Sequence, residues 1–283
     1  VILAREHAPK SKALFQAFGR AIDSLQGRYI TAEDVGISVE DMRIVRSETP
    51  FVSGLPQSGA AAGGDPSPWT ALGVFHGIEA AAAARLGSES LEGVSVAVQG
   101  VGHVGTYLCK LLHEAGAKLL VADVNRENLV SLCEEVPAEV VSPRDILFSD
   151  ADVLAPCALG NVLNSETIPR IRAKIVAGAA NNQLASVEDG ARLAERGVLY
   201  APDYVINAGG VISVAYEYLG NSTEAKVRSE VCRIPQRLRR IFTDAVSSAR
   251  PTNVVADELA QQIVAKGRQS ETTNLSTAGR RIA

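Results

Sequence analysis

The chain has 283 residues, of which 46% are apolar and 21% charged, the composition of an ordinary globular protein. Its length lies where a single hydrophobic core usually divides, which predicts two domains. The formal net charge of -4 gives no support for a nucleic-acid or anionic-membrane partner. No apolar run in the sequence is long enough to span a bilayer as a helix.

The cysteines and histidines show no metal-binding spacing. There is no CxxC pair and no HExxH motif, so a metal site is not expected. Scattered cysteines in a chain of this size are typical of small core residues in a reducing compartment. The start of the chain has no basic stretch followed by an apolar core, as a signal peptide would. A cytoplasmic location is therefore expected.

The first part of the chain is expected to be helical and irregular. Apolar residues recur on one face of residues 11–26, and a second short helix is predicted over 39–48. Residues 53–66 are rich in Gly, Ala, Ser and Pro, which predicts a loop at a domain boundary. Ser67 as N-cap and Pro68 at the first helical position then open a helix that continues to about residue 86.

From residue 91 the pattern changes to strands that alternate with helices. The expected strands are residues 94–98, 118–122, 152–156, 174–179 and 198–202. Near-continuous apolar strands separated by helices predict an α/β fold with a Rossmann-type, doubly wound parallel sheet covered on both faces. The remainder is expected to be helical over residues 208–219, 223–249 and 254–268.

A glycine-rich motif lies at the first of these strand-to-helix junctions. In VAVQGVGHVGTYL, the three glycines follow a predicted strand and open a predicted helix, as the dinucleotide fingerprint requires. The first glycine allows a tight turn, the second lets the backbone approach a pyrophosphate, and the third lets helix and strand pack closely. The helix start offers N–H groups to the phosphates. The candidate cofactor-binding residues here are Gly100, Val101, Gly102, His103, Val104, Gly105 and Thr106.

Asp123 ends the next strand, about 20 residues beyond the first glycine, where an acid binds the adenosine ribose 2′-OH. A carboxylate there repels a 2′-phosphate, which favours NAD over NADP. Arg126 lies close by in the sequence and keeps NADP as the alternative. A Rossmann-like fold without any cofactor is the second alternative.

Several longer stretches resemble the glutamate, leucine, valine and phenylalanine dehydrogenase family, with the leucine dehydrogenases the most similar members. The matching stretches are GRYITAEDVG, VEDM, DPSPWTALGVFHGIEA, SLEGVSVAVQGVGHVG, APCALG, IPRIRAKIVAGAANNQL and YAPDYVINAGGVISVA. The resemblance implies two domains and a homo-oligomer. Residues 1–66 would be the remaining part of the substrate-binding and oligomerisation domain, and residues 67–250 the NAD-binding domain. The C-terminal helix of residues 251–283 would pack back on the first domain.

The resemblance also implies an activity: reversible, NAD-dependent oxidative deamination of a branched-chain L-amino acid (leucine, valine or isoleucine) to the 2-oxo acid and ammonia. This chemistry needs a lysine that activates water and a carboxylate that transfers protons. The carboxylate maps onto Asp34. The lysine, in a GGGK motif, is expected just upstream of Val1, so the chain is expected to be N-terminally incomplete. A phenylalanine-type enzyme and a truncated, non-catalytic NAD-binding homologue are the alternatives.

Near the nicotinamide, the resemblance implies Thr70, Asn182 and Asn207, whose short polar side chains suit a carboxamide and a ribose. Helix packing is the alternative role for Thr70. Asn182 and its neighbour Asn181 are alternatively simple turn formers, and their adjacency leaves open which one points inward.

Cys157 and Ala158 are expected to pass the cofactor ribose, with Cys157 a small packed residue rather than a nucleophile. Ala32, Val211 and Val214 match the family's pocket for the substrate side chain. All three are uncharged, so a glutamate side chain would have no partner there. The two valines favour a branched-chain substrate over phenylalanine, and ordinary core packing is the alternative for them.

Overall fold

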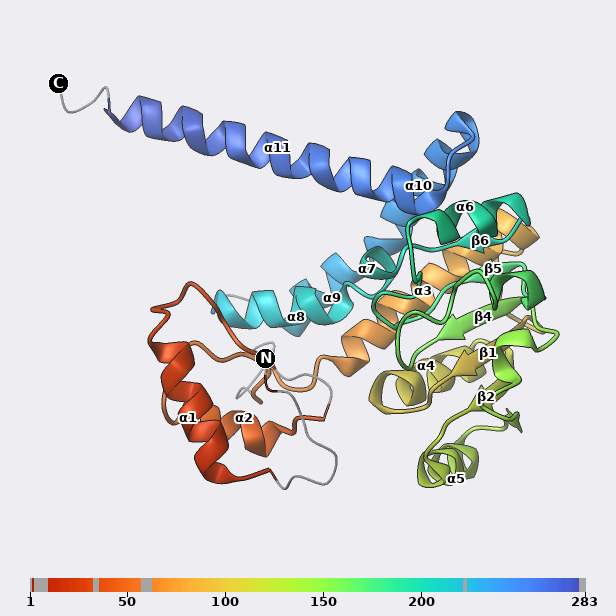
Figure 1. Cartoon of the computed structure of the whole chain (residues 1–283), viewed down its shortest axis with the longest axis horizontal. Helices are drawn as coiled ribbons and strands as arrows, with labels where there is room; N and C mark the ends of the chain where they lie inside the picture. Colours follow the sequence, from red (N-terminus) through yellow and green to blue (C-terminus); the bar gives the residue numbers. More distant parts are fainter. Residues whose placement is uncertain (1, 3–9, 33–35, 57–62, 221–222, 280–283) are drawn as a thin grey trace. The chain divides into compact units, whose positions relative to one another are not determined.

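A computed structural model of the chain describes residues 2, 10–32, 36–56, 63–220 and 223–279, with side chains up to residue 267. It forms two compact units (Figure 1). Unit 1 comprises Val1–Thr70 and Ala208–Cys232, and unit 2 comprises Ala71–Asn207 and Arg233–Ala283. Helix α3 (Ser67–Leu86) begins in unit 1 and continues in unit 2.

The helices of unit 1 are α1 (Lys12–Asp23), α2 (Val39–Arg46), α8 (Gly209–Tyr218) and α9 (Glu224–Val231). Helix α1 starts where the Ser11 hydroxyl accepts from Leu14 N–H, and α2 starts at a capping box between Ser38 and Asp41. A small core forms between α1 and α2 from Phe15, Met42, Val45 and Val52. A parallel bridge joins Thr31 to Val52 beside this core.

The C-terminal segment of unit 1 differs from the expected domain boundaries. The sequence predicts one domain over 67–250, whereas the structure groups residues 208–232 with the N-terminal part of the chain. Two contacts explain this. The Ser53 hydroxyl donates to the Val214 carbonyl oxygen at 3.0 Å. Gly209 lies so close to α3 that a Cβ atom there would be 2.0 Å from the Trp69 carbonyl oxygen.

Unit 2 contains a six-stranded, fully parallel sheet in the order β3-β2-β1-β4-β5-β6. The strands are β1 (Ser95–Gln99), β2 (Lys118–Ala122), β3 (Glu139–Val140), β4 (Val153–Pro156), β5 (Ile175–Val176) and β6 (Leu199–Tyr200). This is the strand order of a Rossmann fold, and it confirms the predicted fold class. All of β4 and the middle of β1 are buried, which requires cover on both faces.

The helices of unit 2 besides α3 are α4 (His103–Glu114), α5 (Arg126–Glu135), α6 (Glu188–Glu195), α7 (Asp203–Ile206), α10 (Ile234–Ser248) and α11 (Thr252–Gly279). Two short 3₁₀ helices, η1 (Ile146–Phe148) and η2 (Ile168–Arg170), complete it. The core between these elements includes Leu154, Val176 and Leu193.

Three elements differ from the sequence-based expectation. Strand β3 was not expected, because it has only two residues and both are exposed. The expected helix over 223–249 is two helices, α9 and α10, because Pro235 occupies the first turn of α10 and cannot continue a helix that precedes it. Helix α11 packs on α10, α6 and β6 within unit 2, whereas the sequence predicts packing on the first domain. Its buried residues Val255 and Ala256 join Ile241 and Ala245 of α10.

The contact between α3 and α7 offers a test of this packing. A Cβ atom at Gly77 would lie 2.4 Å from Cγ1 of the fully buried Ile206. Overpacking costs about 1–3 kcal/mol, against a gain of about 1 kcal/mol when a helical glycine becomes alanine. The net range is about 0–2 kcal/mol, and we expect Gly77→Ala to lower the free energy of unfolding by about 1 kcal/mol, measured by urea denaturation followed by circular dichroism.

Gly267→Ala is the control, because nothing lies within 4 Å of a Cβ atom at that helical glycine. In an Ile206→Ala background, Gly77→Ala should cost less, because the two nearest crowding atoms are gone and only Leu238 Cδ1, at 3.0 Å, remains. An unchanged urea midpoint for Gly77→Ala alone would contradict the close contact.

Candidate functional site

The glycine loop after β1 is held by two backbone contacts that no side chain can enter. Gly100 has a φ of +92°, and a Cβ atom there would lie 2.8 Å from the Ala158 Cβ. A Cβ atom at Gly105 would lie 2.1 Å from the Gly100 carbonyl oxygen. The first glycine is therefore needed for the turn, and Gly105 for packing α4 on the end of β1.

Gly102 has the opposite environment. It is the N-cap residue of α4, no side chain caps this helix, and nothing lies within 4 Å of a Cβ atom built on it. A side chain at Gly102 would therefore occupy open space at the start of α4, the end of the helix that carries the N–H groups of His103 and Val104. Free N–H groups at the positive end of a helix fit an anion such as a pyrophosphate. The residues present fit a dinucleotide.

The remaining loop residues fix its shape. The Thr106 hydroxyl donates to the Val101 carbonyl oxygen at 2.8 Å, so Thr106 acts within the loop in this structure. Val101 N–H donates to Oδ2 of Asp123 at 2.8 Å, and Asn125 N–H donates to the other carboxylate oxygen at 2.7 Å. Asp123 thus lies at the end of β2 directly beside the glycine loop, where the sequence predicts it.

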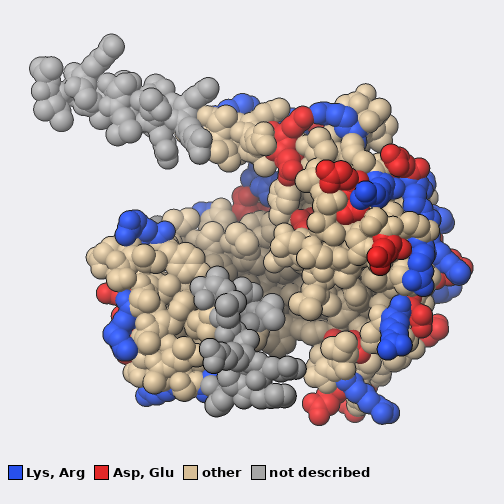
Figure 2. Space-filling view, viewed as in Figure 1, with Lys and Arg blue, Asp and Glu red and all other residues tan. Residues whose placement is uncertain are grey.

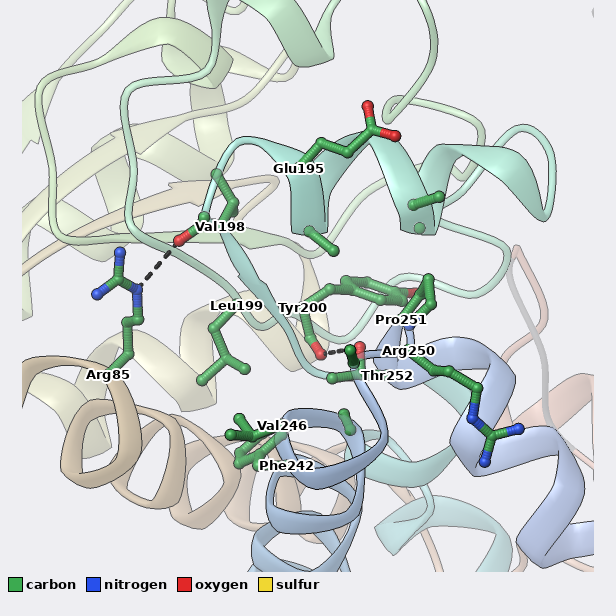
Figure 3. A pocket seen from close by; sticks show the side chains of 16 residues that line it. Arg85, Glu195, Val198, Leu199, Tyr200, Phe242, Val246, Arg250, Pro251 and Thr252 are labelled. Atoms are coloured by element: carbon green, nitrogen blue, oxygen red, sulfur yellow. Dashed lines mark hydrogen bonds between the residues drawn. The ribbon is translucent and has the colours of Figure 1, made fainter.

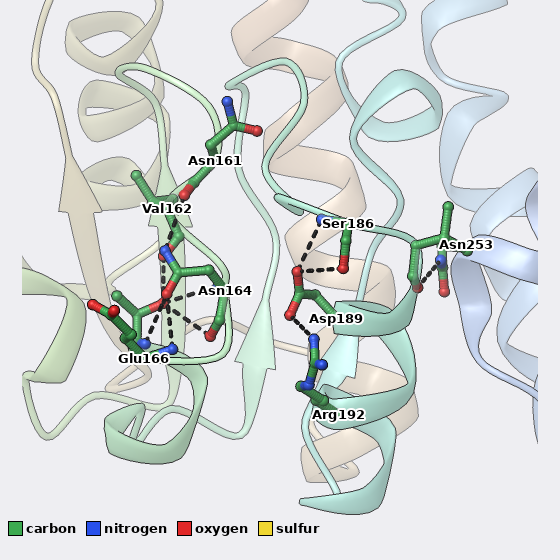
Figure 4. Close-up of polar contacts among 10 residues, drawn as sticks. Asn161, Val162, Asn164, Glu166, Ser186, Asp189, Arg192 and Asn253 are labelled. Carbon is green, nitrogen blue, oxygen red and sulfur yellow. Dashed lines mark hydrogen bonds and ion pairs between the residues drawn. The ribbon is translucent and has the colours of Figure 1, made fainter.

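The loops after β4 and β5 run side by side along the same edge of the sheet (Figure 4). Asn161 N–H donates to the Asn182 carbonyl oxygen at 2.6 Å, and a parallel bridge joins Leu163 to Leu184. Gly160 permits this approach, because a Cβ atom there would lie 2.4 Å from the Asn181 carbonyl oxygen.

Side chains anchor both loops at their far ends. The Asn164 side chain accepts from the N–H groups of Glu166 and Thr167 at 3.0 Å each. In the second loop, buried Asp189 accepts from both the N–H and the hydroxyl of Ser186 and pairs with Arg192 at 2.6 Å. These hydrogen bonds fix the C-terminal ends of both loops, so the loops are held at the carboxyl edge of the sheet.

Gln183 is a structural residue that the sequence-based prediction missed. Its side chain is fully buried, and its Nε2 donates to the carbonyl oxygens of Gly178 at 2.9 Å and Ala180 at 3.0 Å. Its backbone N–H donates to the Asp203 carboxylate at 3.0 Å. Gln183 therefore closes the loop that presents the two asparagines. Its position after the asparagine pair was the only signal in the sequence.

The two asparagines have different roles in the loop. Asn207 Nδ2 donates to the Asn181 side-chain oxygen at 2.6 Å and to the Ala179 carbonyl oxygen at 3.0 Å. Asn182 is in the left-handed region, with a φ of +52°, as a turn-forming asparagine often is. Asn207 is thus joined directly to Asn181, while Asn182 is exposed beside it.

Cys157 is half-buried at the start of the loop after β4, next to exposed Ala158. Its N–H donates to the Gln99 carbonyl oxygen at 2.7 Å, which ties this loop to β1. Burial raises the pKa of the Cys157 thiol to about 12, and a hydrogen bond from Ala179 N–H offsets only part of that effect. The thiol is neutral near pH 7, which supports a packing role rather than a nucleophilic one.

Unit 1 contains the residues expected around the substrate side chain and also Thr70, which was expected near the nicotinamide. Thr70 donates from its hydroxyl to the Pro66 carbonyl oxygen at 3.2 Å, and Gly210 packs against it, so its helix-packing role is present. Ala32 and Val214 are half-buried. Val211 is 74% exposed, so it is not a core residue of its unit. Asp34 lies outside the described residues.

A cavity of about 530 Å³ lies elsewhere in unit 2, between α3, α6, β6 and α10 (Figure 3). Its lining includes Leu199, Phe242 and Val246, with Arg85 and Arg250 among its polar residues. None of the residues predicted from the sequence lines it. This cavity therefore has no part in the candidate site.

The charges and the described helices add little to the choice of partner. On the visible face of unit 2, Lys and Arg side chains are interspersed with Asp and Glu (Figure 2). Within the described ranges, no three His, Cys, Asp or Glu side chains are grouped to hold a metal ion. No described helix has the combined length and apolarity needed to cross a membrane.

Comparison with known proteins identifies relatives over most of the chain. A family model described as Glutamate/Leucine/Phenylalanine/Valine dehydrogenase matches residues 65–126 and 120–271. Leucine dehydrogenase from Geobacillus stearothermophilus is 48% identical over 93% of this chain and 71% of that protein. Phenylalanine dehydrogenase from Bacillus thermotolerans is 38% identical over 95% of this chain and 72% of that protein. The crystal structure of L-tryptophan dehydrogenase from Nostoc punctiforme, 43% identical, has a TM-score of 0.76 and covers 92% of this chain and 74% of that chain.

The two glycines with opposite environments give a paired test. Gly105→Ala should lower the melting temperature, because its new methyl group would meet the Gly100 carbonyl oxygen. Gly102→Ala should melt like the wild type but bind NADH about tenfold more weakly, a loss of ~1.4 kcal/mol, because the methyl group would fill the space next to the helix N-terminus. Thermal-shift assays with and without NADH measure both effects. Wild-type NADH affinity in Gly102→Ala would contradict the placement of the pyrophosphate.

Proposed function

The chain belongs to the glutamate/leucine/phenylalanine/valine dehydrogenase family, and we propose that it oxidises a branched-chain L-amino acid to the 2-oxo acid and ammonia with NAD. The observation that carries the proposal is 48% identity to a leucine dehydrogenase over most of the chain, against 38% to a phenylalanine dehydrogenase. Leucine, valine and isoleucine are the proposed substrates.

The carboxyl edge of the sheet supports a nicotinamide cofactor. The start of α4 and Gly102 would hold its pyrophosphate, and the Asp123 carboxylate would accept from the adenosine ribose hydroxyls. When bound, NAD supplies the acceptor for the hydride that leaves the substrate Cα. Asn207 and its bonded partner Asn181 would then orient polar groups at the nicotinamide end. The carboxylate of Asp123 favours NAD over NADP.

The chain's own residues supply positioning and proton transfer. We assign Asp34 the transfer of protons to and from the substrate nitrogen as the imine forms and is hydrated. The family resemblance also implies a lysine that activates water, and activity experiments therefore use the protein expressed from its complete gene. Thr70 and Asn182 are proposed to contact the nicotinamide as well.

The substrate pocket is proposed to include Ala32, Val211 and Val214. Burying a glutamate side chain among uncharged residues would leave its carboxylate without a partner, which is costly. The exposure of Val211 within its own unit supports a role outside the core. The preference for a branched chain over phenylalanine rests on small differences in pocket size, each worth ~1–3 kcal/mol.

We also propose that the protein is a homo-oligomer, as the family resemblance implies. Helix α11 carries exposed apolar side chains, Ile263 and Val264, that are 71% and 54% accessible. Neighbouring exposed apolar side chains are compatible with a contact surface for another chain. The next experiment distinguishes an active dehydrogenase from the alternative, a non-catalytic protein that binds NAD.

At alkaline pH, the complete-gene product should form NADH from L-leucine, L-valine and L-isoleucine, and the absorbance of NADH measures the rate. It should form little from L-glutamate. Asp34→Asn should lower kcat by about 10²–10⁴-fold, the range expected for loss of an acid–base group, with the NADH dissociation constant unchanged. A wild-type protein that binds NADH but oxidises none of these amino acids supports the non-catalytic alternative. A fully active Asp34→Asn variant removes that residue from the mechanism.

Cofactor choice is tested at Asp123. We expect Asp123→Ser to raise the KM for NAD by about 10–100-fold, because hydrogen bonds to a charged group are worth about 1.5–3 kcal/mol. The loss of the bond from Val101 N–H weakens both cofactors, so the ratio of kcat/KM for NADP to that for NAD is the readout, and it should rise. Glu127→Gln, an exposed acid at the start of α5, is the control. An unchanged ratio would argue against the ribose contact.

A further inference from the structure

We propose that Glu217 is a positioning residue that holds α8 in place and so determines which amino-acid side chains the enzyme accepts. The inference rests on the proposed function, because it assumes that Val211 and Val214 of α8 contact the substrate. Nothing in the sequence distinguishes Glu217 from an ordinary acid near the end of a helix.

Both oxygens of the Glu217 carboxylate are used. Oε2 accepts from Gly54 N–H at 2.8 Å, and Oε1 accepts from Leu55 N–H at 3.1 Å. Two neighbouring backbone donors on one carboxylate fix both the distance and the direction of the contact. The helix is thereby clamped to the segment of residues 52–55 rather than merely resting against it.

The segment that receives this clamp is itself immobilised. Val52 belongs to the core between α1 and α2, and Leu55 packs against the same core. Ser53 is fully buried. The segment cannot move together with α8, so any shift of α8 has to break the two hydrogen bonds to Glu217.

The same segment connects α8 to the other wall of the proposed pocket. Ser53 N–H donates to the Thr31 carbonyl oxygen at 2.8 Å, and Ala32 follows Thr31 directly. On its other side, the Ser53 hydroxyl donates to the Val214 carbonyl oxygen at 3.0 Å. Segment 52–55 thus lies between Ala32 and α8, and the separation of Ala32 from Val214 depends on the bonds that cross it.

The residue type matters because only a carboxylate of this length can accept two N–H groups here. Glutamine keeps one acceptor oxygen and turns an NH₂ group toward one of the donors, which repels it. Alanine removes both acceptors. Either change frees the C-terminal half of α8 while leaving the bond from Ser53 in place, so we expect a wider or more variable pocket rather than an unfolded unit.

Cofactor binding provides the internal reference. Glu217 and its partners all belong to unit 1, whereas the glycine loop and Asp123 belong to unit 2. Thr70, proposed to contact the nicotinamide, packs against Gly210 at the first turn of α8, whereas Glu217 lies at the other end of that helix. A change confined to the Glu217 end should therefore leave the NADH dissociation constant nearly unaltered. A purely structural role for Glu217 would instead lower stability and reduce turnover of every amino acid by the same factor.

The experiment uses the complete-gene product with Glu217→Gln, Glu217→Ala and the control Glu224→Gln, which removes the same charge from an exposed position on α9 of the same unit. We measure kcat/KM for L-leucine, L-valine and L-phenylalanine, the NADH dissociation constant and the melting temperature. If Glu217→Ala does not fold, Glu217→Gln carries the test.

For Glu217→Gln we expect the leucine-to-phenylalanine ratio of kcat/KM to fall about tenfold, the size of effect that a methylene-scale change in a pocket produces. The NADH dissociation constant should stay within about twofold, and Glu224→Gln should match the wild type. An unchanged ratio in an active Glu217→Gln enzyme overturns the inference and leaves the proposed function standing. A wild type that oxidises none of the three amino acids overturns the proposed function, and the inference falls with it.

Discussion

The approach of two backbone segments at the carboxyl end of β1 sets the geometry of everything that unit 2 can bind. Gly100 and Gly105 meet so closely that a single carbon atom on either would collide with backbone or with Ala158. Strand β1 is central in the sheet, and hydrogen bonds fix the loops on both sides of it to this contact. Asp123, after β2, accepts from Val101 N–H, and Cys157 N–H, after β4, donates to the Gln99 carbonyl oxygen. The space beside Gly102 exists because the chain on both sides of it is fixed.

Unit 1 is organised by polar contacts as much as by its small core. Two side chains attach its helix α8 to the segment of residues 52–55: the Ser53 hydroxyl donates to a backbone carbonyl oxygen of α8, and the Glu217 carboxylate of α8 accepts from two backbone N–H groups of the segment. Such contacts are directional, so they define where a helix lies more narrowly than apolar packing does. The hydrogen bonds that place α8 are thereby different from those that shape the glycine loop. The preference for a substrate side chain can therefore change while the binding of the pyrophosphate stays the same.

The sequence predicted the features whose signals are local. Apolar strands, glycine spacing and the position of Asp123 each depend on neighbours in the chain, and the structure contains them. Features that depend on distant partners were not accessible: the bond from Gln183 N–H to Asp203, the clamp at Glu217 and the grouping of residues 208–232 with unit 1. The choice between Asn181 and Asn182 needed a backbone angle and a contact with Asn207, which adjacent identical residues cannot reveal.

Unit 1 is built from two stretches of chain with the whole parallel sheet between them. The bond from Gly54 to Glu217 closes a separation of 163 residues. During synthesis, all strands of the sheet are made before α8, so the N-terminal helices of unit 1 must wait for their last helical partners until the strands of unit 2 have been synthesised. Until then, segment 52–55 presents unsatisfied N–H groups next to an apolar surface. The clamp that arranges the substrate side of the molecule thus forms only after a long wait, and a nascent chain is exposed to misassociation in that interval.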